Sequence, residues 1–393
     1  MQERRTIQRL NLSTIAATHG FSDGFQVLLF PILPMIMKEL GLSNLQTGAI
    51  VSAQGIAVFL MLMPASMLSD YLGRRKMILA IGLSLSSLSL FGIGIFGYSY
   101  YPILLLGLVS GLGISTFHPT ATALVAEYFV SRPGFHMGIF SLGGSIGNAS
   151  LPAIIGVVAL SAGWRSGVMA VVLPAIVFAV LVYIFFPEHP KARQSVKETF
   201  SGVWEKILRN GPVLKLIIIY ALRGIGCTGI LTFLPFLIAD SMGADAGTAG
   251  LLLSVYFMMG AAGKPVLGFL YDRFKVPKLL CLLFVTGFCI TLVIIKTTFL
   301  PLLLVMMGML GIVTNMSPII MTAATSLVDD SVRTSTVGMI YTAYELRFMS
   351  PLIGGWLADS YSLRYSFLLF AAVLLIGGMA SLMLKEVPKI KSA

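Results

Sequence analysis

Ionisable side chains deep inside apolar segments are the residues of this chain best suited to chemistry. Asp23, Arg223 and Lys264 each lie within a long apolar run, and Glu345 and Arg347 share another. A charge at the centre of a bilayer costs at least about 2.5–3.5 kcal/mol, so it is retained where it meets a partner or a water-filled cavity. With a rise of about 1.5 Å per residue, these groups lie at a similar depth. We expect them to line one polar cavity.

The charge balance of this cavity favours an anion. Three deep cations face two deep carboxylates before any histidine is protonated, and a cavity with surplus positive charge attracts anions. Cations together with aromatic side chains suit a small carboxylate or phosphonate. The side chains predicted to bind substrate are Lys264, Arg223, Arg347, Tyr256, Tyr341, Gln26 and His118.

A second set of side chains is suited to binding protons. His19, Asp23 and Gln26 follow i, i+4, i+7 spacing and share one helix face. Asp23 is the first choice for proton coupling, because a carboxylate that the membrane desolvates beside a histidine can take up a proton near neutral pH. His19 and Glu345 are the further candidates. Sodium coupling is not excluded, but no cluster of carboxylates and helix breaks argues for it.

The interaction partners of two of these groups, His118 and Arg347, have more than one candidate. His118 precedes Pro119, so its ring has the alternative of bonding a backbone carbonyl that the proline frees. Glu345 and Arg347 are two residues apart, so we expect them to point differently and to have separate partners. Arg347 is expected to face Asp23 across the cavity, and a fixed structural pair is the alternative.

The elements that carry these residues are membrane helices. Hydrophobic residues make up 57% of the chain and charged residues 11%, against about a quarter charged in soluble proteins. Apolar segments long enough to cross a hydrocarbon core of about 30 Å recur along its whole length. We predict an all-α membrane protein with twelve transmembrane helices in two six-helix bundles. The predicted spans are 12–37, 45–69, 77–97, 102–129, 136–161, 166–187, 213–239, 247–270, 279–296, 300–327, 335–358 and 363–384.

The chain divides into two similar halves. Its one long polar stretch predicts an N-terminal bundle at 1–187, a cytoplasmic linker at 188–212 and a C-terminal bundle at 213–393. Apolar residues at helical spacing in the linker indicate an amphipathic helix on the membrane surface. Landmarks repeat about 200 residues apart, which indicates a duplication with the substrate site between the halves. The repeated pairs are Pro119 and Pro318, Pro152 and Pro351, Arg165 and Arg364, and Asp70 and Asp272.

Charge distribution predicts the orientation. Lys and Arg gather between spans on the side of the N-terminus, which places both termini in the cytoplasm of a multi-pass cell-membrane protein. The net charge of +11 therefore reflects topology and excludes nucleic acid as a partner. The N-terminus does not resemble a cleaved signal. The cysteines Cys227, Cys281 and Cys289 fit neither a disulfide framework nor a zinc site, so we expect no cofactor and no metal, and a monomer in lipid.

The pattern Asp70-Tyr-Leu-Gly73-Arg74-Arg75-Lys76, the twelve spans, the central loop and Gly-Trp-Arg at 163–165 resemble the major facilitator superfamily over essentially the whole chain. Ser66 stands where that loop signature has glycine, and the second copy keeps Gly268, Asp272 and Arg273 but lacks the later glycine. The resemblance implies that Asp70 sits at the positive end of helix 11 and locks an outward-facing state. The alternative is that the basic residues only set topology. The gating set is Asp70, Gly73, Arg74, Arg75, Asp272 and Arg273.

Two narrower resemblances bear on the substrate. Gly263-Lys264 with Gly268 and Asp272 is similar to oxalate/formate and monocarboxylate carriers, in which a cation at this position holds the carboxylate. His19 to Gln26 together with Phe117-His118-Pro119 resembles fosmidomycin-resistance exporters, so export is an alternative to uptake. Gly143 and Gly147 match an antiporter motif incompletely, because Asn148 replaces its proline; we expect these glycines to serve close helix packing.

These patterns predict a proton-coupled secondary transporter of small organic anions that works by alternating access. The alternative is a drug or metabolite efflux antiporter. A membrane receptor would need a soluble domain, and an intramembrane enzyme would need a third orienting group beside His19 and Asp23.

Overall fold

The computed structural model describes residues 2–129, 132–186, 209–329 and 333–385, and these contain helices and turns but no strand. The apolar positions of the predicted linker helix lie outside the described residues. The helices are α1 (Gln2–Phe25), η1 (Phe30–Ile32), α2 (Leu33–Leu40), α3 (Asn44–Leu72), α4 (Arg75–Phe96), α5 (Tyr100–Ser115), α6 (Phe117–Tyr128), α7 (Pro133–Phe185), α9 (Gly211–Met242), α10 (Ala246–Arg273), α11 (Val276–Lys296), α12 (Leu300–Thr314), α13 (Ser317–Ser326), α14 (Arg333–Tyr344), η3 (Glu345–Phe348), α15 (Met349–Ser360) and α16 (Leu363–Leu382).

The described helices account for twelve crossings. Ten helical segments are long and apolar enough to cross a membrane. One of them, in α7, reverses direction at Gly163, whose φ of 80° lies in the left-handed region that glycine adopts readily. This segment therefore contributes two crossings. The crossing made of α14, η3 and α15 is broken into pieces that are each too short to count. The predicted all-α fold with twelve membrane helices is confirmed.

Equivalent breaks interrupt one helix in each half. The fourth crossing changes from α5 to α6 at Thr116, just before Pro119. The tenth changes from α12 to α13 at Asn315 and Met316, just before Pro318. Proline has no N–H to donate to the carbonyl four residues earlier and its ring crowds that carbonyl, so the two prolines account for both breaks. They set the direction of the side chains that follow, His118 among them.

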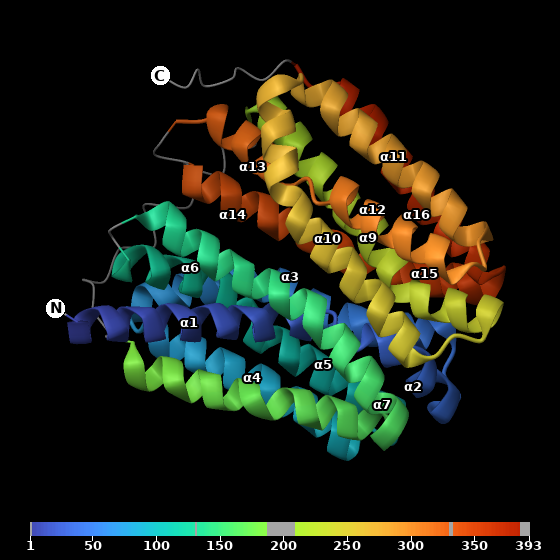
Figure 1. Ribbon diagram of the computed structural model, residues 1–393, viewed down its shortest axis with the longest axis horizontal. Helices are drawn as coiled ribbons and strands as arrows, with labels where there is room; N and C mark the ends of the chain where they lie inside the picture. Colours follow the sequence, from blue (N-terminus) through green and yellow to red (C-terminus); the bar gives the residue numbers. More distant parts are fainter. Residues whose placement is uncertain (1, 130–131, 187–208, 330–332, 386–393) are drawn as a thin grey trace.

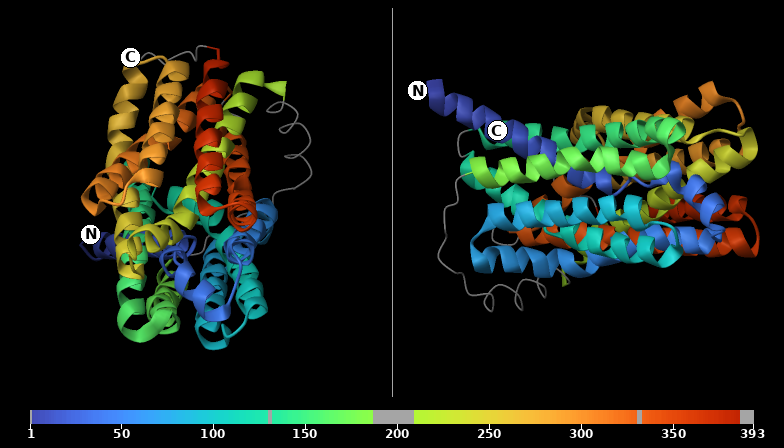
Figure 2. Two further views of the ribbon diagram at one scale, coloured as in Figure 1. Left: turned by 90° about the vertical axis from the view of Figure 1, so that its right-hand side faces the viewer. Right: turned by 90° about the horizontal axis from the view of Figure 1, so that it is seen from below.

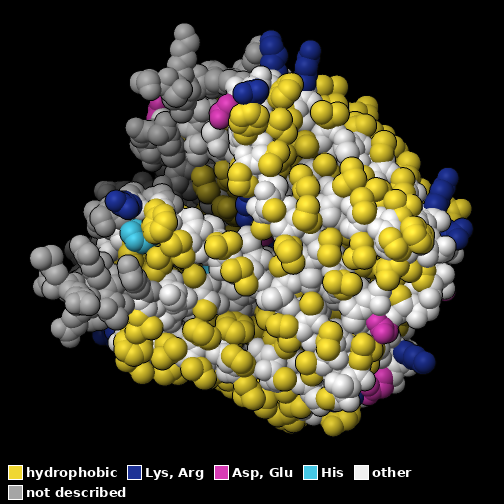
Figure 3. Space-filling view, viewed as in Figure 1, with side chains coloured by type: hydrophobic (Ala, Val, Ile, Leu, Met, Phe, Trp, Pro, Cys, Tyr) yellow, Lys and Arg dark blue, Asp and Glu magenta, His cyan; other side chains and the backbone are white. Residues whose placement is uncertain are grey.

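The two bundles lie side by side and touch mainly at one end. Helices α1 to α7 form one group and α9 to α16 the other (Figures 1 and 2), and the two groups meet where α3 contacts α15 and α7 contacts α10. Hydrophobic side chains cover most of the face in Figure 3, as expected of a surface in lipid, with Lys and Arg toward its margins. We call the end at which α3 and α10 begin and α15 finishes the closed end.

Glycines make the contact at the closed end. A Cβ added at Gly48 would lie 2.0 Å from the Pro351 carbonyl oxygen, and one at Gly250 would lie 2.2 Å from that of Pro152. These two contacts are counterparts in the duplicated halves: α3 meets α15, and α10 meets α7. Because no side chain stands between them, the two backbones touch directly, and the halves are held tightly there.

Candidate functional site

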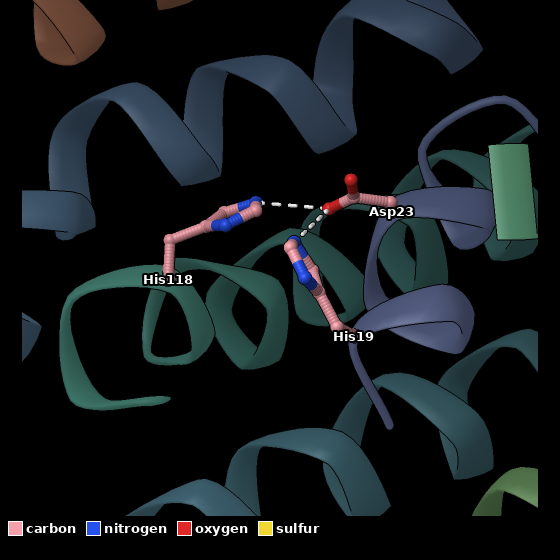
Figure 4. A group of neighbouring side chains, drawn as sticks. All are labelled: His19, Asp23 and His118. Atoms are coloured by element: carbon pink, nitrogen blue, oxygen red, sulfur yellow. Dashed lines mark ion pairs between the residues drawn. The ribbon is translucent and has the colours of Figure 1, made fainter. Parts of the chain in front are cut away.

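Two histidines and an aspartate meet in the N-terminal half. His118 Nε2 lies 3.1 Å and His19 Nε2 lies 3.4 Å from the same oxygen, Oδ1, of Asp23 (Figure 4). His19 and Asp23 come from one face of α1, as their spacing predicted, and His118 reaches them from α6 just beyond the break at Thr116. The alternative partner for His118, a freed backbone carbonyl, is not what the ring meets.

Close packing of α1 on α7 holds this group. A Cβ at Gly147 would lie 1.8 Å from the Gly20 carbonyl oxygen, and one at Gly143 would lie 2.0 Å from that of Ala16. The prediction that the glycines serve close packing is confirmed. Their neighbour Asn148 donates its Nδ2–H to Asp23 Oδ2 at 3.3 Å. The residue that breaks the antiporter motif thus touches the proposed proton site, a role that sequence reasoning missed.

The expected pairing of Arg347 with Asp23 is wrong. Arg347 Nε lies 3.2 Å from Glu345 Oε2, and its Nη2 also donates to the Gln26 side chain. The crossing leaves α-helical geometry at η3, and both long side chains bend into the same space despite being two residues apart. The expectation of separate partners for Glu345 and Arg347 is therefore wrong as well. Since each neutralises the other, this cation is less available to an anion.

Arg223 is held by neutral groups in the C-terminal half. Its Nε donates to the Thr314 carbonyl at 2.6 Å and its Nη1 to the Tyr344 hydroxyl at 2.8 Å. The guanidinium also lies 5.3 Å from the Tyr344 ring centroid, in the range of a cation–π contact. Tyr256 is only 4% exposed, and its hydroxyl bonds the Thr314 hydroxyl at 2.9 Å. It therefore helps to hold Thr314, the residue whose carbonyl accepts from Arg223. Tyr341 is 46% exposed.

Lys264, like Arg223, has no carboxylate partner among the described residues, and it reaches from one half of the chain to the other. It lies on α10, half-buried, and its Nζ donates to Ser145 Oγ of α7 at 3.2 Å across the two halves. Within the described ranges it forms no ion pair with a carboxylate, unlike Arg347. A lysine that bonds only a hydroxyl keeps donors for an anion.

The gating set is spread over both halves. Gly73 ends α3 with a φ of 62°, and Arg74 precedes α4. Arg75 pairs with Glu127 of α6, which ties α4 to α6 inside one half. Asp70 lies in the last turn of α3, and its side chain is outside what the structure describes. Asp272 and Arg273 are exposed at the end of α10, with the Arg273 guanidinium 4.2 Å from the Phe269 ring.

Asp359, which sequence reasoning missed, links the halves at the closed end. Its carboxylate accepts the backbone N–H groups of Asn44 and Leu45, each at 2.9 Å, and the Asn44 side-chain amide at 2.8 Å. It therefore caps the N-terminus of α3 from the far half. Its place just beyond the predicted span 335–358 was the available signal.

Two bundles of membrane helices with ionisable groups at mid-depth define a carrier that moves small molecules across a membrane. The profile of the Major Facilitator Superfamily matches residues 15–346 and 216–393, and the chain belongs to this superfamily. It is accordingly a multi-pass membrane transporter and not an enzyme.

Comparisons with individual proteins agree with this. The chain is 25% identical over 257 residues to the probable L-galactonate transporter of Escherichia coli strain K12, covering 60% of this chain and 55% of that protein. It is 26% identical over 285 residues to the nitrite extrusion protein of Bacillus subtilis strain 168, covering 72% and 70%. A bacterial homologue of the human lysosomal transporter Spinster, solved in an inward-facing and unoccupied conformation, superposes with a TM-score of 0.82 at 16% identity over 96% of both chains.

Proposed function

We propose that this chain is a proton-coupled secondary transporter that moves a small organic anion by alternating access. Lys264 carries the proposal, because it lies between the halves without a carboxylate partner in the described residues. The two relatives are named as a probable L-galactonate transporter and a nitrite extrusion protein, and both names specify an anion, which supports an anionic substrate here. Arg223, with its aromatic neighbours, is the second anion contact.

In this proposal the proton is carried by the group of His19, Asp23 and His118. Both rings approach one carboxylate oxygen, so a single proton changes the charge of the whole group. Lys264 bonds Ser145, which lies on α7 near Asn148, and Asn148 bonds Asp23. This short path through α7 supports electrostatic coupling between the proposed anion site and the proposed proton site.

The remaining parts of the proposal concern topology. Residues 1–187 and 213–393 move as two bundles joined by 188–212, with both termini in the cytoplasm of the cell membrane. The closed end faces outward, and a single chain is the working unit. The contacts of Gly48 and Gly250 at that end support an inward-facing arrangement.

Transport in proteoliposomes tests the anion assignment. Lumenal pH is followed while carboxylates, phosphonates or cationic drugs are added outside. We expect proton movement with anions, and a loss of anion affinity of about 10- to 100-fold in Lys264→Gln, because one charge-assisted hydrogen bond contributes about 1.5–3 kcal/mol. Lys296→Gln, at an exposed helix end, is the matched control. Proton movement with cationic drugs alone would overturn the anion assignment.

Asp23→Asn tests the coupling. The variant is expected to bind the anion and to exchange it across the membrane, but without moving protons. Proton movement at the wild-type rate in this variant would refute the role of Asp23. The extrusion function named for the Bacillus subtilis relative makes export the second candidate, so vesicles of both orientations are assayed.

A further inference from the structure

Three side-chain atoms that are common metal ligands converge in the N-terminal half. The ligand atoms of His19, Asp23 and His118 all lie within 4.8 Å of one another. Figure 4 shows both imidazole rings directing a nitrogen at the same carboxylate oxygen. Imidazole with carboxylate is a ligand set that suits divalent first-row transition ions. The cysteine spacing gave no sign of this group, because its ligands are histidine and aspartate side chains from two separate helices.

The hydrogen bond of His19 decides what its other nitrogen can do. Nδ1 lies 2.7 Å from the Phe140 carbonyl oxygen, which only accepts, so Nδ1 carries a hydrogen. In the neutral ring Nε2 is then a lone pair that faces the carboxylate of Asp23 at 3.4 Å, acceptor against acceptor. A cation between them resolves this conflict. A ring N–H bonded to a backbone carbonyl is also the usual support of a metal-bound histidine.

The two spacings between a ring nitrogen and the carboxylate oxygen fit a shared ion. Ligands about 2.0–2.1 Å from Zn²⁺ in tetrahedral geometry lie about 3.3 Å apart. The two nitrogen-to-oxygen distances here are 3.1 and 3.4 Å. The second oxygen of Asp23 is held by Asn148, as a supporting partner would hold it. In the described part of the chain, no Lys or Arg pairs with this carboxylate.

The backbone of α7 comes close to the ligand atoms at Gly144. A Cβ added at Gly144 would lie 2.5 Å from Asp23 Oδ2 and 2.8 Å from His19 Nε2, so a larger residue here would displace these atoms, and glycine leaves them in place. The ring of His19 is stacked on Phe140 at 4.1 Å between centroids, which fixes its orientation. The His118 side chain is 42% exposed and provides the accessible side of the group.

We infer that His19, Asp23 and His118 bind one divalent first-row transition ion, of which Zn²⁺ is the representative. Three protein ligands leave at least one coordination position for water or a small anion. The inference goes beyond anion transport and does not depend on it, because metal binding is measured on the purified protein without any gradient. A proton and a metal ion would each satisfy the facing lone pairs of His19 and Asp23. The experiment distinguishes these two occupants.

The test is a titration of the full chain in detergent with Co²⁺, followed by displacement with Zn²⁺. The affinity tag carries no histidine, and His136 and His189, which lie apart from the group in sequence, are replaced by alanine in the parent protein. We expect the visible absorption of four-coordinate Co²⁺, one ion per chain, and its loss on adding Zn²⁺. Zn²⁺ should also raise the Tm of the parent protein.

Two variants decide whether the group is the site. His118→Ala should abolish the absorption and the rise in Tm. Asn148→Ala keeps all three ligands and should weaken Co²⁺ binding by roughly 10- to 100-fold, as removal of a supporting partner does. The inference would be overturned if the parent protein bound no Co²⁺ or if binding persisted unchanged in His118→Ala. A proton would then be the one occupant of this group. Far-UV circular dichroism and cooperative thermal unfolding of each variant without metal report that it is folded.

Discussion

Replacement of Asp359 by Asn is expected to loosen the closed end of the molecule. The carboxylate accepts three hydrogen bonds from Asn44 and Leu45 at the start of α3, from the opposite half of the chain. Its counterpart in the first half, Leu160, is apolar and contacts Gly247, so the duplication does not itself require this charge. Asp359 therefore acts as an added latch on an interface that glycines already form.

The magnitude follows from the geometry. Asparagine keeps one oxygen acceptor but loses the negative charge at a helix N-terminus. A charge in that position contributes typically 0.3–1 kcal/mol at an exposed site, and Asp359 is exposed. With one charged hydrogen bond weakened in addition, we expect a loss of about 1 kcal/mol, or about a fivefold rise in the population with this end open.

Cysteine labelling measures this population. Ser52 is 1% exposed and donates to the Phe348 carbonyl of the opposite half at 2.6 Å, so Ser52→Cys in a cysteine-free chain reacts with a maleimide only after the halves separate. The Asp359→Asn background should raise the reaction rate about fivefold. Asp240→Asn, at an exposed site near the same end, should leave it unchanged. Equal rates in the parent and Asp359→Asn proteins would refute the latch.

The latch also has a defined pH dependence. Burial alone would raise the pKa of Asp359, but hydrogen bonds from Leu45 and Asn44 outweigh it and hold the pKa below its ordinary value of 3.8. Because its pKa is lowered, the ionised carboxylate gives its full stabilisation of the closed end at any pH above the ordinary pKa. This stabilisation is lost as the pH falls through the lowered value. The fivefold ratio between parent and variant should therefore persist from neutral pH to about pH 5.

Two further predictions concern packing and charge. Gly147→Ala should lower stability by about 1–3 kcal/mol because its Cβ meets the Gly20 carbonyl at 1.8 Å, whereas Gly138→Ala, with nothing within 4 Å, should not; thermal unfolding in detergent compares them, and equal Tm values would contradict the close contact. Glu345→Gln should cost about 3 kcal/mol by leaving Arg347 unpaired, and adding Arg347→Gln should recover much of this loss. A double variant less stable than Glu345→Gln would show that the pair is not the cause.

Features local to one helix could be predicted from the sequence. The twelve crossings follow from apolar runs longer than the bilayer needs, and the shared face of His19 and Asp23 follows from their spacing. The prolines Pro119 and Pro318 marked the places where two helices break. Each of these depends on neighbours in the chain, which the sequence displays directly.

Features that depend on tertiary geometry could not be predicted. The pairing of Arg347 with Glu345 needs the 3₁₀ turn at η3, and Pro351, three residues beyond that turn, does not indicate which side chains the turn brings together. Asn148 and Asp359 act across helices far apart in the chain. A polar residue at a helix end or beside a glycine has many possible partners, and only the packing of the two halves selects one.

The repeated glycine contact at the closed end bears on how such a chain arises. Gly48 on Pro351 and Gly250 on Pro152 are the same contact made twice, once from each half. A six-helix chain carrying both the glycine and the proline would present a self-complementary surface, as a two-fold homodimer requires. Two such chains would close this end by pairing with each other before any linker joined them. Fusion would then free each copy to diverge, and the latch at Asp359, with Leu160 as its counterpart, is one such divergence.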